Sequence, residues 1–184
     1  MRLLGPNCLG TLNTETGLCT SFSAVFSRGF PSPGPVGIVS QSGAYGAHVL
    51  HLASQRGIGT RYWITTGNEA DVDAADAIEW MAHRPEVRVI LAYVERVRDG
   101  GRFLAALEAA RWSKTPVVLL KTESSDTVRG RQTRTRAPWR DLMRSAIRSR
   151  GRTGSIALTA STSNWMSSTP VSVLRRSEDA ISAS

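Results

Sequence analysis

A turn of small polar residues, Ser40-Gln41-Ser42-Gly43, is the part of the chain best suited to hold an anion. A short apolar run, 36–39, precedes this turn, and an apolar pattern with helical spacing follows it from Ala44. The arrangement predicts a buried strand that leads into a helix, with Ser40 or Ser42 as the N-cap. The free N–H groups of a first helical turn and the positive end of the helix dipole attract negative charge. We therefore interpret the turn as a phosphate site. An ordinary strand-to-helix connection, which any α/β domain contains, is the alternative.

The turn needs a sheet to position it, and apolar runs alternate with helical patterns from Val36 onwards. This alternation is typical of an α/β fold with a doubly wound parallel sheet. In such sheets the ligand sits outside the carboxyl ends of the strands, where the turn, residues 66–69, Glu95 and Lys121 all fall. The predicted strands are 36–39, 61–65, 87–94 and 115–121, and the predicted helices are 44–54, 74–82 and 101–114.

Length and composition bound the class of protein. The 184 residues suffice for one domain of ordinary size, or for one domain with an appendage. The sequence contains no run of about 18 apolar residues, so it predicts no membrane span. The apolar stretch at the N-terminus is too short for a signal peptide. Two cysteines, Cys8 and Cys19, make neither a disulfide framework nor a metal-ligand spacing. We expect a cytoplasmic protein without membrane contact.

Positive charge is concentrated at one end of the chain. The net charge is +8, yet residues 1–122 hold 12 Lys and Arg against 10 Asp and Glu. The remaining 11 Lys and Arg and 5 Asp and Glu lie in residues 123–184. Because the first part is electrostatically ordinary, we do not expect nucleic acid as its partner.

Two segments flank the alternating region 35–122. Residues 1–34 contain one short apolar run and end in a Pro-rich link, so they cannot form their own core and resemble the end of a preceding domain. Residues 123–184 have single arginines among Ser and Thr, and no strand or helix periodicity continues in them. A disordered basic tail that binds RNA or an acidic surface is one explanation. An out-of-frame translation of a GC-rich gene is the other.

The acidic residues of 67–73 suggest a metal loop at first sight. Their spacing lacks the Gly and the terminal Glu of an EF-hand, so a helix cap by Asp71 or Asp73 is the better explanation. We expect no metal site. His48 and His51 follow the phosphate turn and are interpreted as packing residues rather than ligands.

Several short stretches together resemble the NDP-forming acyl-CoA synthetases, the family of ADP-forming acetyl-CoA synthetase and of relatives of the succinyl-CoA synthetase alpha subunit. Each stretch alone is a weak signal, whereas their order and spacing are specific. They run through residues 1–122. The stretches are LLGPNCLG (3–10), VSQSGA (39–44), GIG (57–59), GNEADVD (67–73), YVE (93–95) and PVVLLK (116–121).

The resemblance implies a fold and a reaction. Residues 35–122 would form a flavodoxin-like, succinyl-CoA-synthetase-like domain, and residues 1–34 would be the remnant of a CoA-binding Rossmann domain. Acyl-CoA, ADP and phosphate would give free acid, CoA and ATP through an acyl phosphate that phosphorylates a histidine. CoA and ADP or ATP with Mg²⁺ are the implied cofactors. Acyl-CoA is the implied small-molecule partner, and an ATP-grasp domain or subunit is the implied protein partner.

The resemblance also assigns roles to site residues. Ser42, Gly43 and Ala44 correspond to the turn that holds the phosphorylated histidine. Glu95 corresponds to the catalytic glutamate that hydrogen-bonds this histidine. A solvated glutamate paired with Arg98 is the alternative for Glu95.

Near the N-terminus, Asn7 and Cys8 correspond to residues beside the CoA thiol and the acyl group. A buried structural cysteine is the alternative role for Cys8, because nothing nearby in the sequence would lower its pKa.

The catalytic histidine of the family has no counterpart in the chain, since His48, His51 and His83 do not lie in a Ser-His-Thr-Gly-Ala-like motif. With suitable synonymous codons, an alternative frame over residues 132–143 reads Ala-His-Thr-Gly-Ala. We therefore interpret the chain as a fragment, frameshifted after about residue 122, that is inactive as a ligase by itself. A module that binds CoA phosphate or another anion, with a basic nucleic-acid-binding tail, is the alternative function.

Overall fold

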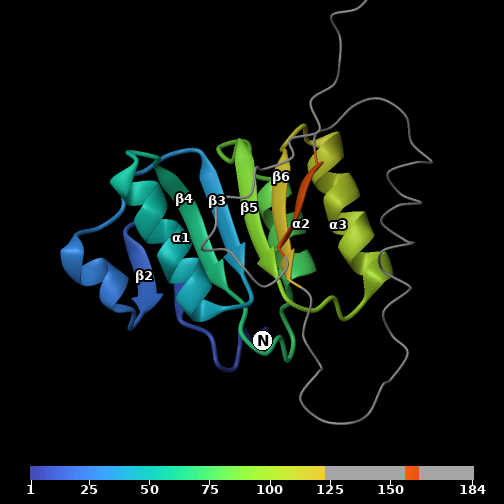
Figure 1. The fold of residues 1–184 in the computed structure, drawn as a ribbon, viewed down its shortest axis with the longest axis horizontal. Coiled ribbons are helices and arrows are strands. Elements are labelled where there is room, and N and C mark those ends of the chain that lie inside the picture. The colour runs from blue at the N-terminus through green and yellow to red at the C-terminus, as the bar shows by residue number, and fades with distance from the viewer. Residues whose placement is uncertain (123–155, 162–184) are drawn as a thin grey trace, which may run out of the picture.

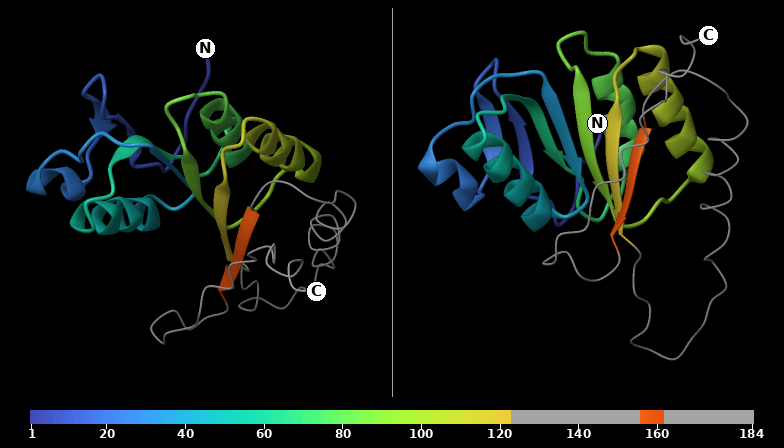
Figure 2. Two further views of the ribbon diagram at one scale, coloured as in Figure 1. Left: turned by 90° about the horizontal axis from the view of Figure 1, so that it is seen from above. Right: turned by 45° about the horizontal axis from the view of Figure 1, so that its top comes forward.

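One mixed β-sheet with helices on both faces forms the part of the chain that the computed structural model describes, residues 1–122 and 156–161 (Figure 1). The strand order is β2-β1-β4-β3-β5-β6-β7, and the strands from β4 to β7 run parallel. Helix α1 covers one face, and α2 and α3 cover the other (Figure 2). The strands are β1 (Gly10–Asn13), β2 (Leu18–Ser21), β3 (Val36–Ser40), β4 (Thr60–Thr65), β5 (Val89–Val94), β6 (Val117–Thr122) and β7 (Ile156–Ser161). The helices are η1 (Ala24–Arg28, a 3-10 helix), α1 (Gly43–Gln55), α2 (Ala74–Ala82) and α3 (Gly100–Trp112).

The doubly wound α/β fold is confirmed, and each predicted strand and helix is present with ends that differ by at most two residues. β5 begins at Val89 because the N–H of Val87 still bonds to the carbonyl of Arg84 in the preceding turn (3.0 Å). Such shifts are ordinary, because turns and caps rather than apolar periodicity decide where an element ends.

Hydrophobic clusters on the two faces of the sheet hold the helices in place. Trp63 of β4 is fully buried under α1, where it packs with Ile38 and Leu50 and donates its indole N–H to the carbonyl of Gly46 (2.9 Å). On the opposite face, apolar side chains of α2 and α3 form a larger cluster with β3, β5 and β6. β3 lies between these clusters, and all five of its residues are buried.

The sheet is mixed rather than entirely parallel, which corrects the sequence-based expectation. β1 and β2 form an antiparallel hairpin, and β1 pairs antiparallel with β4 through Thr11 and Ile64. The hairpin strands have only four residues each, and β2 is mostly exposed, so they lack the apolar run that marks a buried strand. Residues 10–21 thus extend the sheet of the following region. The assignment of residues 1–34 to a preceding CoA-binding domain stays a prediction.

A seventh strand lies where the sequence predicts none. β7, residues 156–161, pairs in parallel with β6. In its sequence, IALTAS, the apolar residues Ile156, Leu158 and Ala160 alternate with the small or polar residues Ala157, Thr159 and Ser161, which suits a strand. The surrounding Arg, Ser and Thr residues obscure this short run. The rest of the predicted basic tail, residues 123–155 and 162–184, lies outside the described residues.

The N-terminal segment lies along the loop that follows β4. The N–H groups of Asn68, Ala70 and Val72 donate to the carbonyls of Pro6, Gly5 and Leu3 at 2.8, 2.9 and 3.0 Å, in that order. Gly67 has a φ of +61°, and a Cβ atom there would lie 2.3 Å from the carbonyl oxygen of Pro6. The two segments, far apart in sequence, therefore meet backbone to backbone.

Charged side chains tie the same segment to α2 and α3. Arg2 contacts Asp71 and Asp76 (3.0 and 3.1 Å), and Arg102 also contacts Asp76. Asp76 and Asp73 form a capping box, in which each side chain accepts a hydrogen bond from the other's backbone N–H.

None of the helices in the described part of the chain has the length and apolar character needed to span a membrane.

Replacing Gly67 by Ala should destabilise the fold more than replacing Gly57 by Ala. Both glycines have positive φ, +61° and +67°, but a Cβ atom at Gly57 meets nothing within 4 Å. Gly57→Ala should cost about 1 kcal/mol from backbone conformation alone. Gly67→Ala should cost about 2 to 4 kcal/mol, because the segment at Pro6 must also move. Urea unfolding measures both losses, and equal losses would contradict the close backbone contact.

The stabilisation by Asp76 should disappear in acid. Burial raises the pKa of this carboxyl. The hydrogen bond from the N–H of Asp73 and the charge of Arg102 together lower the pKa by more than burial raises it, so the net shift is downward. A lowered folded-state pKa adds stability above the ordinary value of about 3.9, and this stability is lost as the pH falls through the folded-state pKa. Asp76→Asn should therefore cost about 1 to 2 kcal/mol at pH 7 and much less near pH 2.

Urea unfolding of both proteins at the two pH values gives this difference. Arg2→Gln is the matched control. Since the Arg2 side chain is 63% exposed, its loss should cost well under 1 kcal/mol at either pH. An equal effect of Asp76→Asn at both pH values would contradict the prediction.

Candidate functional site

The turn between β3 and α1 presents two backbone N–H groups without an acceptor among the described residues. Ser42 is the N-cap of α1, since its Oγ accepts from the N–H of Tyr45 (3.2 Å) and its carbonyl accepts from Gly46 (2.9 Å). The N–H groups of Gly43 and Ala44, the first two of the helix, have no acceptor within residues 1–122 and 156–161. Ala44 is exposed and Gly43 is half-buried. These donors and the helix dipole make the turn suitable for an anion.

The first Gly of α1 allows the N-terminal loop to approach the turn. A Cβ atom at Gly43 would lie 2.6 Å from Cγ of Leu9. The N–H groups of Leu9 and Gly10 both donate to Oγ1 of Thr65, at 2.8 and 2.9 Å.

Of the two serines predicted as N-cap of this helix, Ser40 and Ser42, Ser40 is not the cap. Its hydroxyl donates to the carbonyl of Ser42 (2.6 Å) and stiffens the turn.

Glu95 follows β5 at the same edge of the sheet, and its side chain is exposed. Within the described residues, no hydrogen bond or ion pair engages its carboxylate, so the predicted pairing with Arg98 does not occur. The main chain at Glu95 is instead held firmly. Its N–H donates to Oε1 of Gln41 (2.7 Å), and its carbonyl accepts from Nζ of Lys121.

Lys121, at the end of β6, is a buried cation beside this glutamate. Burial lowers the pKa of its ammonium group, and the nearby charge of Glu95 partly opposes that effect. The two residues thus carry opposite charges at the carboxyl ends of adjacent parallel strands.

Gln41 and Glu69 are site residues whose roles sequence reasoning misses. In the sequence Gln41 is only a polar residue between two serines, and Glu69 is one of several acidic residues in a predicted helix-cap loop. In the structure Glu69 is 4% exposed and accepts hydrogen bonds from Thr66, Gln41 and the N–H of Ala74, each at 2.8 Å. Burial raises the pKa of its carboxyl, and the three donors partly offset this rise.

The other predicted site residues lie in the N-terminal loop. Asn7 is exposed with a φ of 56°, and its amide donates to Oδ1 of Asn68 (3.2 Å). Cys8 is half-buried, and its thiol lies 3.8 Å from the carbonyl of Leu4. Both residues reach the edge of the sheet that carries the anion turn, because Leu9 beside them packs on Gly43.

The acidic residues of the loop 67–73 have structural roles. Asp73 caps α2, Asp71 contacts Arg2, and Glu69 bonds to its neighbours. In the part of the chain that the structure describes, no group of three His, Cys, Asp or Glu residues could hold a metal ion. Of the two predicted caps, Asp73 is the cap of α2 and Asp71 is not.

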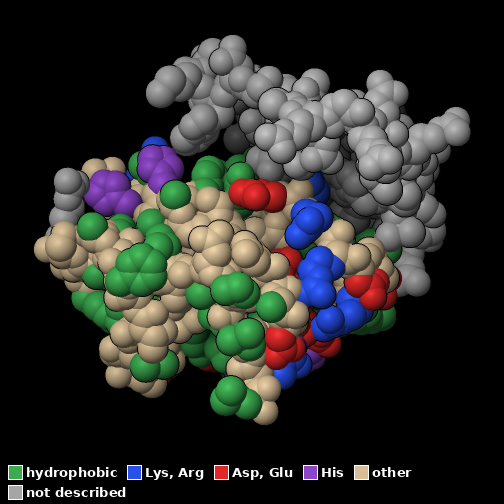
Figure 3. Space-filling model, turned by 90° about the horizontal axis from the view of Figure 1, so that it is seen from below, with side chains coloured by type: hydrophobic (Ala, Val, Ile, Leu, Met, Phe, Trp, Pro, Cys, Tyr) green, Lys and Arg blue, Asp and Glu red, His purple; other side chains and the backbone are tan. Residues whose placement is uncertain are grey.

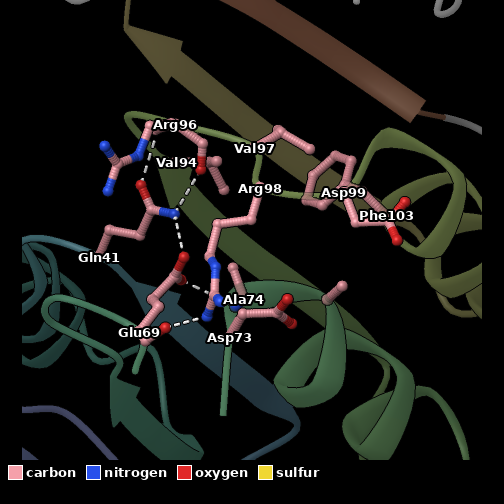
Figure 4. Close-up of a pocket in the computed structure, with 11 residues that line it drawn as sticks. Gln41, Glu69, Asp73, Ala74, Val94, Arg96, Val97, Arg98, Asp99 and Phe103 are labelled. Atoms are coloured by element: carbon pink, nitrogen blue, oxygen red, sulfur yellow. Dashed lines mark hydrogen bonds between the residues drawn. The ribbon is translucent and has the colours of Figure 1, made fainter. Parts of the chain in front are cut away.

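A small pocket lies between the loop after β5 and the start of α2 (Figure 4). Gln41, Glu69 and Arg98 reach toward one another from three different loops in this view. The face at the carboxyl ends of the strands carries a row of Lys and Arg side chains on one side, beside Asp and Glu (Figure 3). Much of the rest of that face is hydrophobic or uncharged.

Comparison with protein families identifies the domain. The family described as "Succinyl-CoA ligase like flavodoxin domain" matches residues 33–160. The match covers more than half of the chain and extends past residue 122, where the recognisable motifs end.

Curated relatives match about two thirds of the chain. The alpha subunit of acetate–CoA ligase [ADP-forming] II of Pyrococcus furiosus is 37% identical over 127 residues, which make up 69% of this chain and 26% of that protein. Acetate–CoA ligase [ADP-forming] I of Archaeoglobus fulgidus is also 37% identical over 127 residues, 69% of this chain and 18% of that protein. The chain thus matches about a quarter or less of the length of these relatives.

Solved structures agree with the sequence matches. The dinucleotide-forming acetyl-coenzyme A synthetase 1 of Ca. Korarchaeum cryptofilum, solved in complex with phosphate and ADP, has a TM-score of 0.57 and 29% identity. This match covers 66% of the present chain and 25% of the other. A Pyrococcus horikoshii OT3 protein has a TM-score of 0.61 and 27% identity over 89% of this chain and 31% of its own. The chain therefore belongs to the succinyl-CoA ligase-like flavodoxin domain family of the NDP-forming acyl-CoA synthetases.

Proposed function

We propose that this chain contributes the phosphohistidine-receiving part of an acyl-CoA ligase that converts acyl-CoA, ADP and phosphate into acid, CoA and ATP. The observation that carries the proposal is the pair of open N–H donors at Gly43 and Ala44. A phosphoryl group on a histidine has several anionic oxygens, and such a group matches two backbone donors at the positive end of a helix. The relatives named as ADP-forming ligases support this assignment.

In this proposal Glu95 orients the incoming histidine. A carboxylate that accepts a hydrogen bond from one ring nitrogen fixes the tautomer and leaves the other nitrogen for phosphoryl transfer. The exposed carboxylate of Glu95, which accepts no hydrogen bond from the described residues, is open for that role. Gln41 and Lys121 hold its main chain while leaving the carboxylate accessible.

Asn7 and Cys8 are proposed to lie beside the thiol end of CoA and the acyl group. Support comes from the packing of their loop against the anion turn, since an acyl phosphate formed there would lie near the histidine that accepts it. CoA supplies the thiol that leaves from, or attacks, the acyl carbon. Mg²⁺ with ADP or ATP is assigned to an ATP-grasp partner, as the family resemblance implies.

The histidine itself must come from elsewhere. His48, His51 and His83 do not lie in a Ser-His-Thr-Gly-Ala-like motif. We expect the phosphorylated histidine and the ATP-grasp domain on a separate segment or subunit. The coding DNA for residues 120–145 tests whether a change of reading frame removed the histidine motif, because only an alternative frame that spells His-Thr-Gly would support that hypothesis.

An acidic residue at position 44 should weaken anion binding without harming the helix. In wild type, inorganic phosphate should shift the NMR signals of the Gly43 and Ala44 amides. Ala44→Asp places a carboxylate in the first turn, where it stabilises the helix dipole by some tenths of a kcal/mol but repels phosphate. We expect the phosphate affinity to fall by about tenfold or more, which is on the order of 1.4 kcal/mol.

The matched control is Ser54→Asp, which adds the same charge at an exposed position of α1. This position lies about 15 Å from Ala44, at a rise of about 1.5 Å per residue, so the affinity should change less than about twofold. The titration is done at constant ionic strength. Equal losses in both variants, or no shift of the two amides in wild type, would refute the proposed anion turn.

The purified chain alone should have no ligase activity. Its three histidines do not lie in the Ser-His-Thr-Gly-Ala-like motif that carries the phosphoryl group in the family, and the proposal assigns nucleotide binding to a partner. A luciferase assay for ATP made from acetyl-CoA, ADP and phosphate checks this expectation, with an intact ADP-forming acetate–CoA ligase as the positive control. ATP formation above the buffer background would overturn the assignment of these parts to a partner.

A further inference from the structure

The side-chain amide of Gln41 makes every hydrogen bond available to it. Its Nε2 donates to Oε2 of Glu69 (2.8 Å) and to the carbonyl of Arg96 (2.6 Å). Its Oε1 accepts from the N–H of Arg96 at 2.9 Å, as Figure 4 shows, and from the N–H of Glu95 at 2.7 Å. An amide has two donor hydrogens and two acceptor lone pairs, so this side chain is fully satisfied. One residue thereby clamps the main chain that carries Glu95.

Glu69, the partner of Gln41, is also held by several hydrogen bonds. Its buried carboxylate accepts from Thr66, Ala74 and Gln41 at 2.8 Å each, and its own carbonyl accepts from the guanidinium of Arg98. Its φ of 58° lies in the left-handed region, which costs a non-glycine residue about 1 to 2 kcal/mol. A buried carboxylate in an unfavourable backbone conformation persists because its neighbours over-determine its position.

The charge of Glu69 dictates which way the amide of Gln41 faces. A carboxylate only accepts hydrogen bonds, so the NH₂ group of Gln41 must point toward Glu69. The oxygen of Gln41 then points toward the N–H groups of Glu95 and Arg96. Since Gln41 directly precedes the N-cap Ser42, the same short segment carries both the clamp and the start of the anion turn.

We propose that Glu69 and Gln41 are positioning residues that set Glu95 relative to the anion turn at 42–44. The proposal rests on the proposed function for the meaning of that geometry. In this role the two residues act through the loop after β5, which Gln41 holds by its bonds to Glu95 and Arg96. The polar pair thus fixes one edge of the site before any ligand arrives.

The substitution Glu69→Gln tests the clamp with a change of one functional group. The amide oxygen of the variant side chain must stay with the donors Thr66 and Ala74, which leaves its NH₂ group facing the NH₂ group of Gln41. To avoid this contact, Gln41 must turn its amide over and release the N–H groups of Glu95 and Arg96. We expect the amide hydrogens of these two residues to exchange about tenfold faster than in wild type.

Exchanging the two side chains between positions 41 and 69 should restore the slow exchange of the Glu95 and Arg96 amides. In the double variant Gln41→Glu with Glu69→Gln, the carboxylate at position 41 again accepts from Glu95 and Arg96, and it accepts from the new amide at position 69. Slow exchange of the two amides should return in part, since only the bond to the carbonyl of Arg96 is lost. A purely structural loss of stability would not be reversed by this exchange of groups.

Hydrogen exchange followed by NMR measures all three proteins, with the amide of Ala74 as the internal control. Unchanged exchange at Glu95 and Arg96 in Glu69→Gln, or faster exchange in the swap than in the single variant, would overturn the proposal. If Glu69→Gln does not fold, the wild-type protein still tests the proposal. Fast exchange of the Glu95 and Arg96 amides in wild type would contradict the hydrogen bonds from these amides to Gln41. The phosphate titration of wild type tests the proposed function separately, since the exchange experiment needs no ligand.

Discussion

The double burial of β3 is the constraint on which the rest of the structure depends. All five residues of this strand are buried, between β4 and β5 in the sheet and between α1 and α2 across it. Every backbone group of such a strand must find a partner within the sheet. Parallel pairing satisfies these groups and brings the ends of β3, β4 and β5 to one edge. The chain must then leave the sheet at Ser40, and α1 begins where its first N–H groups face that edge.

Satisfying buried polar groups explains the arrangement around this edge. The loops after β4 and β5 cannot pack through apolar contacts alone, because they carry Glu69 and several backbone N–H groups. Gln41 connects the two loops by filling all its own hydrogen-bonding positions. A half-satisfied network would be costly in a buried setting, so its completeness indicates a rigid arrangement. The edge is thus defined by polar contacts that lie on an apolar scaffold.

The N-terminal segment contributes both to the sheet and to the proposed site. It supplies the hairpin that extends the sheet beyond β4, and it also runs along the loop 67–72. Leu9 packs against Gly43, so the loop with Asn7 and Cys8 is held against the anion turn. Separating a preceding domain from the flavodoxin-like domain at residue 34 would break these contacts. The proposed CoA end and the proposed phosphoryl end of the site are therefore joined by direct packing.

Apolar periodicity predicts most of the fold but not its edges. The strands at 36–40 and 89–94 are predictable because each carries a continuous apolar run, as central strands of a parallel sheet do. The first is buried on both faces, and the second is buried on one face and half-buried on the other. The hairpin β1–β2 and strand β7 carry short or interrupted apolar patterns, and their pairing is decided by neighbours distant in sequence. Of the site residues, the turn at 42–44 is predictable, because a helix N-terminus carries its own local signature.

The sequence by itself determined the parallel core, the capped helix after β3 and the family motifs at the carboxyl edge. These features follow from local propensity and from the spacing of apolar residues. Only the tertiary structure decided which side chains control that edge. Glu69 and Gln41 lie 28 residues apart, and their hydrogen bond exists because parallel strands bring their loops together. The orientation of an amide depends on the charge opposite to it, and no local pattern in the chain encodes that neighbour.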